Sequence, residues 1–214
     1  MCWNENVSLN TFLFSGFILA LIVYNNTFTK YKIQELNNKW MYLFIASFIL
    51  MQLIEFFIWR NINNKFYNNI FSIAATLLLI MQPIASIMIL TNNKIRDLLL
   101  IAYLSIAIPF SIYKFSNKHI QSEISECGHL KWNFFGTTSI VWIVWLFFFL
   151  FSFVYEKKWF GLIFGCVALL IAFINYKNDH TAWSMWCWGV NSIMIYYAIY
   201  LLIYLPILEK ANIC

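Results

Sequence analysis

The sequence contains few charged residues. Only 11% of its 214 residues are charged, as fourteen basic and nine acidic side chains, whereas 62% are hydrophobic. A soluble globular domain has about 25% charged and about 45–50% apolar residues, and so few charges cannot cover a surface that faces water. The composition therefore excludes an ordinary soluble domain and predicts that lipid is the main solvent of this chain.

The sequence also lacks the alternation of apolar and polar residues that transmembrane β-strands show over about ten positions. It has continuous apolar runs instead. Because every backbone polar group in lipid must be paired within the protein, runs that approach about 20 residues predict membrane-spanning helices. We predict an all-α polytopic bundle of about seven helices, which forms one domain over residues 1–214. The runs cover residues 9–24, 40–59, 66–90, 98–113, 134–155, 159–176 and 181–205.

No basic segment precedes the first run and no small-residue cleavage site follows it, so we expect no signal peptide to be removed. Lysine and arginine are slightly more frequent in the loops after the first, third and fifth helices and at the C-terminus. This bias predicts that the N-terminus is outside and the C-terminus inside. We interpret the net charge of +5 as a topology signal and as contact with lipid headgroups. It does not indicate nucleic-acid binding.

Polar residues form a stripe in the seventh run, where His180, Ser184, Cys187 and Asn191 are spaced four, three and four residues apart. This spacing puts them on one face of a helix, which should point into the bundle because facing hydrocarbon is costly. The stripe serves either hydrogen bonding between helices or a surface that lines a ligand site.

Glu55 is the one acidic residue well inside an apolar run. It shares a helix face with Gln52 and Trp59. Either it reaches outward and pairs with Arg60, or it handles protons or cations within the membrane.

The predicted topology brings Glu55, His129, His180 and Ser184 to the outer side of the membrane. We therefore predict an outward-facing polar pocket that binds or passes a small ligand. The expected lining residues are Gln52, Glu55, Gln82, His129, Trp132, His180, Trp183, Ser184, Cys187 and Asn191. The alternatives are a membrane-embedded hydrolase that uses Glu55, His129, His180 and Ser184, and a structural or partner-binding protein.

The sequence contains no HExxH motif and no pair of histidines at helical spacing, so a zinc site stays open without specific support. The seventh run has no lysine, which excludes a retinal Schiff base there. No CxxC motif occurs. Cys2 and Cys127 are predicted on the outer side, and the alternatives for them are a disulfide bond or free thiols.

Two resemblances bear on function. Ceramidase-like seven-helix hydrolases carry an HxxxH helix, and this chain has Ser184 where the second histidine of that motif would follow His180. Residues 1–5 (MCWNE), 52–60 (QLIEFFIWR), 82–83 (QP), 128–132 (GHLKW) and 184–188 (SMWCW) resemble a multi-pass membrane protein family of giant DNA viruses. That resemblance implies seven helices and a host-cell or virion membrane, and it implies no activity.

Overall fold

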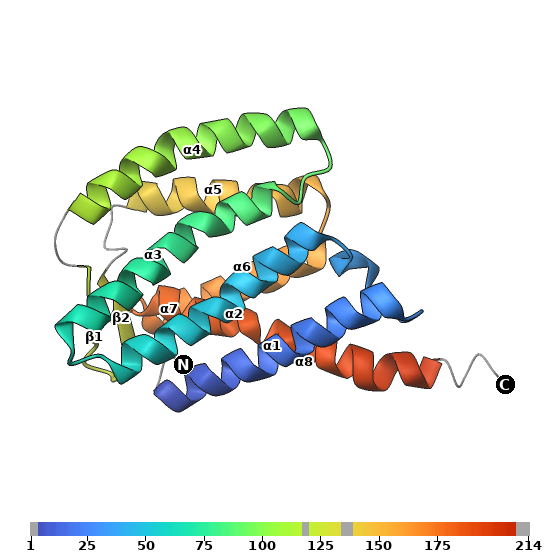
Figure 1. Cartoon of the computed structure of the whole chain (residues 1–214), viewed down its shortest axis with the longest axis horizontal. Helices are drawn as coiled ribbons and strands as arrows, with labels where there is room; N and C mark the ends of the chain where they lie inside the picture. Colours follow the sequence, from blue (N-terminus) through green and yellow to red (C-terminus); the bar gives the residue numbers. More distant parts are fainter. Residues whose placement is uncertain (1–3, 117–119, 134–138, 209–214) are drawn as a thin grey trace.

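The computed structural model describes residues 4–116, 120–133 and 139–208. Over these residues the chain is an all-α bundle (Figure 1). The first six helices are α1 (Glu5–Phe28), α2 (Lys39–Arg60), α3 (Lys65–Ile87), α4 (Asn93–Ser116), α5 (Ser139–Tyr155) and α6 (Trp159–Tyr176). The last span runs through α7 (Ala182–Asn191), α8 (Ile193–Ile199) and the π-helical turn η3 (Tyr200–Tyr204). A short 3₁₀ turn, η1 (Gln34–Leu36), lies between α1 and α2.

The predicted fold class is confirmed. Six helices in the described part of the chain are long and apolar enough to cross a membrane, and α5 is a shorter apolar helix of 17 residues. The chain is therefore a helical protein built for a bilayer. The sidedness of its termini stays a prediction.

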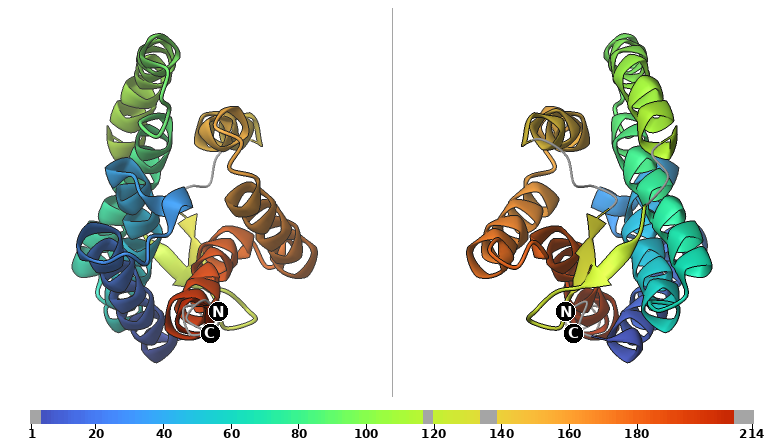
Figure 2. Two further views of the ribbon diagram at one scale, coloured as in Figure 1. Left: turned by 90° about the vertical axis from the view of Figure 1, so that its right-hand side faces the viewer. Right: turned by 90° about the vertical axis from the view of Figure 1, so that its left-hand side faces the viewer.

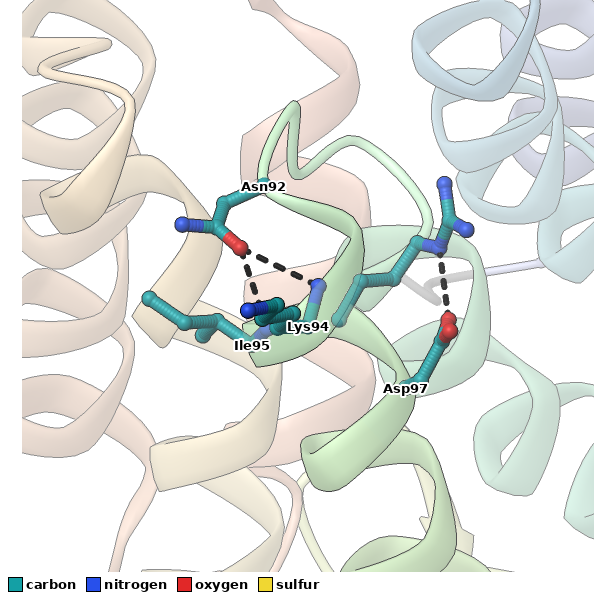
Figure 3. Close-up of polar contacts among 5 residues, drawn as sticks. Asn92, Lys94, Ile95 and Asp97 are labelled. Atoms are coloured by element: carbon teal, nitrogen blue, oxygen red, sulfur yellow. Dashed lines mark hydrogen bonds and ion pairs between the residues drawn. The ribbon is translucent and has the colours of Figure 1, made fainter.

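Asparagine side chains begin the first four helices, which explains why asparagine is frequent at the breaks between apolar runs. The side chains of Asn4, Asn38 and Asn64 accept hydrogen bonds from the first backbone N–H groups of α1, α2 and α3. Asn92 does the same for Lys94 and Ile95 at the start of α4 (Figure 3). Because asparagine is among the preferred N-cap residues, α1 and α4 extend beyond the apolar runs that predicted them.

Sequence neighbours pack together, with α2 against α1 and α3 and with α6 against α7, and in addition α3 packs against α5. The helix α4 lies on the outer flank of α3 (Figure 1). Tyr103 and Ala107 are its two buried residues, and they join a small cluster with Ile87, Leu90 and Phe148. Most of α4 is therefore left to face lipid.

Pro83 lies inside α3, where the absence of its N–H leaves the carbonyl of Leu79 without the usual helical donor. The indole N–H of Trp145 on α5 donates to that carbonyl at 2.9 Å. The hydroxyl of Ser86 likewise donates to the carbonyl of Phe149 on α5 at 2.6 Å. These two hydrogen bonds fix α5 beside the proline-containing half of α3.

The structure contains a small β-hairpin where the sequence indicated only a loop. Strands β1 (Ser122–Ile124) and β2 (Leu130–Trp132) pair antiparallel, with Ser122 opposite Trp132. The turn between them contains Gly128, whose φ of 79° suits glycine. The hairpin lies at one end of the bundle, between α3 and α7 (Figures 1 and 2).

Candidate functional site

The hairpin is held in the bundle by buried polar side chains of α3. The amide of Asn68 donates to the carbonyl of Ser122 at 3.0 Å and accepts from the Ser122 N–H at 2.9 Å. Ser72 contacts the hydroxyl of Ser122 at 3.0 Å. All three residues are buried, so the hairpin is an integral part of this end of the bundle and not a flexible connection.

The other strand of the hairpin rests on α7. The hydroxyl of Ser184 donates to the carbonyl of Leu130 at 2.8 Å and lies 2.9 Å from the carbonyl of Thr181. Leu130 is fully buried and Trp132 is 8% exposed. Ser184, a candidate nucleophile on the sequence evidence, therefore has a clear structural role in seating β2.

Gln52 and Glu55 form a buried pair on α2. Both side chains are fully buried, and the Gln52 Nε2 donates to a Glu55 carboxylate oxygen at 2.9 Å. Arg60, the partner of Glu55 in one of the two alternatives, is exposed and lies over the ring of Phe56. Glu55 thus stays in the core and does not reach toward the membrane surface.

The polar stripe on α7 faces the interior of the bundle, whereas His180, which precedes α7, does not. Ser184, Cys187 and Asn191 are buried, and Cys187 is close enough to Glu55 for an electrostatic interaction. The Asn191 amide donates to the carbonyls of Phe48 and Cys187. Both kinds of contact place α7 directly against α2.

The histidines do not join that core. His180 is exposed and has a left-handed backbone with φ of 56° at the turn between α6 and α7. The half-buried ring of His129 meets the ring of Tyr176 edge-on at 5.3 Å. Burial lowers the pKa of His129, and nearby Asp179 opposes that shift. His119 lies outside the described residues.

Asp179 ties the hairpin turn to the connection between α6 and α7. Its carboxylate accepts hydrogen bonds from Ser125 at 2.7 Å and from Thr181 at 3.2 Å. Burial alone would raise the pKa of Asp179, but hydrogen bonds from Ser125, Thr181 and Cys127 outweigh burial and leave that pKa below its ordinary value. The negative charge of Asp179 is in turn the largest cause of the raised pKa of Cys127.

Cys127 is a free, exposed thiol in the hairpin turn. Cys2, its candidate disulfide partner, lies outside the described residues. The described residues also contain no group of three or more His, Cys, Asp or Glu side chains that is placed to hold a metal ion. Within the described residues, the candidates Glu55, His129, His180 and Ser184 therefore do not belong to such a group.

The remaining expected lining residues are spread along the bundle. Gln82 is fully buried in α3, and its amide atoms have no partner in the described part of the structure. Trp183 stacks on Trp142 of α5 with 3.5 Å between ring centres. That a ligand reaches these residues from the outer side of the membrane stays a prediction.

A cavity lies at the opposite end of the bundle. It is a cleft of about 440 Å³ between α2, α5, α6, α7 and α8, and Asn191 is the one expected lining residue that it contains. Its walls are mainly aromatic, and its mouth carries Glu35, Glu156 and two consecutive lysines, Lys157 and Lys158. The aromatic side chains of the walls include those of Phe44, Phe48, Phe149, Phe153, Trp186 and Tyr197.

Of the two acidic residues at the mouth, Glu156 is hydrogen-bonded and Glu35 is exposed. The Glu156 carboxylate accepts hydrogen bonds from the backbone and hydroxyl of Thr91 at 2.7 and 2.9 Å. The Lys158 ammonium donates to the backbone carbonyl of Glu35 at 2.8 Å. Lys157 is exposed, with φ of 53° in the turn between α5 and α6. The mouth therefore carries the exposed ammonium group of Lys157 beside an apolar interior, together with the carboxylates of Glu35 and Glu156.

No family model, curated protein or solved structure matches this chain. The candidate functional site is therefore inferred from the contacts within this chain.

Sequence reasoning missed the cleft. A signal was present, because Phe44 and Phe48, like Phe149 and Phe153, are four residues apart and so share a helix face. The sequence contains 22 phenylalanines, however, and this background hides two such pairs. Only the packing of α5 against α2 brings the two pairs together.

Proposed function

We propose that this integral membrane protein binds an anionic phospholipid in the cleft between α2, α5, α6, α7 and α8. In this proposal an acyl chain lies against the aromatic walls, and the phosphate group lies at Lys157 and Lys158. The observation that carries the proposal is the combination of an aromatic cleft of about 440 Å³ with two consecutive lysines at its mouth. That volume is within the about 300–1,000 Å³ that small-ligand sites occupy.

The charge distribution supports an anionic headgroup. The loops at the cleft end and the C-terminus hold eight of the fourteen basic residues, among them Lys30, Lys32, Lys39, Lys94 and Arg96. Basic residues next to the membrane attract anionic lipids, which are enriched in the cytoplasmic leaflet. We therefore infer that the cleft opens at the inner leaflet and that the hairpin lies on the outer side. The resemblance to viral proteins suggests a host-cell or virion membrane.

The contacts favour ligand binding over hydrolysis. A serine nucleophile needs a base that takes its proton, and the Ser184 hydroxyl is directed at backbone carbonyls while His180 is exposed. The cleft, by contrast, needs no chemistry to hold a lipid, because close van der Waals packing of an acyl chain against aromatic side chains and a polar contact to its headgroup supply the affinity within a bilayer.

Native mass spectrometry of the purified protein tests the proposal. The protein is equilibrated with equal amounts of phosphatidylglycerol and phosphatidylcholine that have the same acyl chains. We expect one phosphatidylglycerol molecule to be retained in preference. Lys157→Gln should lower that preference several-fold, whereas Lys94→Gln, at the same end but outside the cleft lining, should not. Equal retention of the two lipids would contradict the assignment of an anionic headgroup.

A cleft-filling variant tests the site itself. A Cβ atom added at Gly165 meets no atom within 4 Å, and Gly165 lines the cleft. Gly165→Leu should therefore reduce retention of both lipids without lowering the melting temperature. Val167→Leu, an exposed position on the same helix, is the matched control. Unchanged lipid retention in Gly165→Leu would place lipid binding elsewhere.

A further inference from the structure

We propose that Phe48, Phe149 and Trp186 form an aromatic floor that limits the length of the acyl chain in the cleft, so that the site selects lipids by chain length. This inference rests on the proposed lipid binding and goes beyond it, because a charged headgroup alone does not discriminate between chains of different length. The three residues come from α2, α5 and α7, and all of them line the cleft.

The cleft has the same depth along three helices. It is lined by residues within 41–48 of α2, within 149–156 at the C-terminal end of α5 and within 158–165 at the N-terminal end of α6. Each of these ranges covers seven helical steps, which at 1.5 Å per residue is a depth of about 10 Å. The chains of one leaflet span about 15 Å, half of the hydrocarbon core of a bilayer. The cleft is therefore shallower than a common membrane acyl chain is long.

The aromatic floor closes the inner end of the cleft. Phe48 and Phe149 meet edge-on with 5.8 Å between ring centres, and Trp186 meets them at 6.1 and 5.7 Å. Aromatic rings at these separations are in contact, so a chain does not pass between them. Trp145 stacks on Phe149 at 4.6 Å but does not line the cleft, and so it lies behind the floor. The space for a chain therefore ends at the three rings.

Each residue of the floor is hydrogen-bonded to another helix. The carbonyl of Phe48 accepts from the Asn191 amide on α7 at 3.3 Å, and the carbonyl of Phe149 accepts from a serine hydroxyl on α3 at 2.6 Å. The indole N–H of Trp186 donates to the carbonyl of Gly165 on α6 at 3.0 Å. All three floor residues are also buried. The floor is therefore fixed in place and acts as a stop of constant depth.

A length limit needs one fixed end of the lipid as well as a floor. In the proposed function the phosphate lies at Lys157 and Lys158, which are at the mouth of the cleft. The distance from the phosphate to the floor then sets how much of the chain is accommodated. Because the cleft depth is about two-thirds of one leaflet, we expect the best fit for chains of about ten carbons, which is about two-thirds of a common membrane chain.

Native mass spectrometry of the full-length protein with a series of phosphatidylglycerols tests this proposal. The lipids share one headgroup and carry two identical saturated chains of about eight to about eighteen carbons. We expect retention to increase up to about ten carbons and to fall several-fold for longer chains. Phe48→Ala should move this limit to longer chains by at least about two carbons, because it removes one ring of the floor. Phe44→Ala, the same substitution one turn nearer the mouth, should leave the limit unchanged.

A second variant should move the limit in the opposite direction. The carbonyl of Gly165 binds the Trp186 indole, so Gly165 lies at the level of the floor. A Cβ atom added at Gly165 meets no atom within 4 Å. Gly165→Val should therefore fold normally and shift the limit to shorter chains. This variant keeps the test decisive even if Phe48→Ala does not fold.

Three results would overturn the aromatic floor while leaving lipid binding intact. The first is equal retention of all chain lengths by the wild type. The second is a limit that moves equally in Phe44→Ala and Phe48→Ala, because the volume of the cleft and not its depth would then set the limit. The third is a limit that Gly165→Val does not move. If the wild type retained none of the lipids, the proposed lipid binding itself would be contradicted, and the floor with it.

Discussion

The side-chain amide of Asn68 binds both backbone polar groups of Ser122, accepting from its N–H and donating to its carbonyl. Asn26 uses the same arrangement at the opposite end, where its amide accepts from the N–H of Ile33 at 2.7 Å and donates to the Ile33 carbonyl at 3.3 Å. Both asparagines are buried. Each end of the bundle is thus fixed by an asparagine that satisfies the backbone of a folded-back segment.

Asn68→Leu should detach the hairpin from α3. The substitution removes the hydrogen bonds to Ser122 and leaves buried backbone groups without partners, which costs about 1–3 kcal/mol for each group. We expect a clear loss of thermal stability in detergent, measured by the exposure of the buried Cys187 thiol in a chain whose other cysteines are replaced by alanine. Asn10→Leu, at an exposed position on α1, is the control. Equal melting temperatures for the two variants would refute the structural role of Asn68.

The hydrogen bond between Trp145 and Leu79 should be coupled to Pro83. Trp145→Phe leaves the Leu79 carbonyl unsatisfied and should cost about 1–3 kcal/mol. In a Pro83→Ala background the backbone N–H of residue 83 is able to donate to that carbonyl, so the same substitution should cost less. A double-mutant cycle of unfolding free energies measures the difference. Additive effects would show that the indole does not compensate for the proline.

Asp179 should stabilise the hairpin turn in a pH-dependent way. Its pKa is lowered in the folded protein from an ordinary value of 3.8, so its contribution is present above that pH and is lost as the pH falls through the lower folded value. The difference in melting temperature between wild type and Asp179→Asn should therefore be constant near neutrality and shrink below about pH 3.8. Glu123→Gln, in the exposed part of β1, serves as the comparison. A difference that persists unchanged in acid would argue against the lowered pKa.

His180→Gly tests whether His180 serves only to form the turn between α6 and α7. The φ of 56° at His180 is a conformation that glycine adopts at no steric cost and other residues adopt at about 1 kcal/mol or more. We expect the variant to be as stable as the wild type or slightly more stable, and to retain lipid as the wild type does. Lower stability would mean that the imidazole makes a contact on which the turn depends.

The helical part of the fold was predictable from the sequence because hydrocarbon demands long apolar helices. The predicted bounds of the second and sixth helices agree with α2 and α6 to within one residue. The first and fourth helices were predicted too short. Polar residues form the first turns of these helices, whose backbone N–H groups are capped by Asn4 and Asn92. An apolar run does not indicate where such a capped helix begins.

The hairpin and the cleft were not predictable in the same way. Residues 122–132 are polar and have no strong alternation, so their pairing depends on Asn68 and Ser184, which are distant in the sequence. The polar stripe of α7 did indicate correctly that Ser184, Cys187 and Asn191 face the bundle interior. It did not indicate that His180, four residues earlier, lies outside the helix in an exposed turn.

Accessibility of two single cysteines tests the central claim that the hairpin end and the cleft end lie on opposite sides of a bilayer. One variant keeps only Cys127 in the hairpin turn, and the other carries Lys157→Cys at the cleft mouth with every native cysteine replaced by alanine. In intact cells a membrane-impermeant maleimide should label Cys127 readily, and it should label position 157 only after permeabilisation. Labelling of both positions in intact cells would contradict the proposed membrane-spanning arrangement.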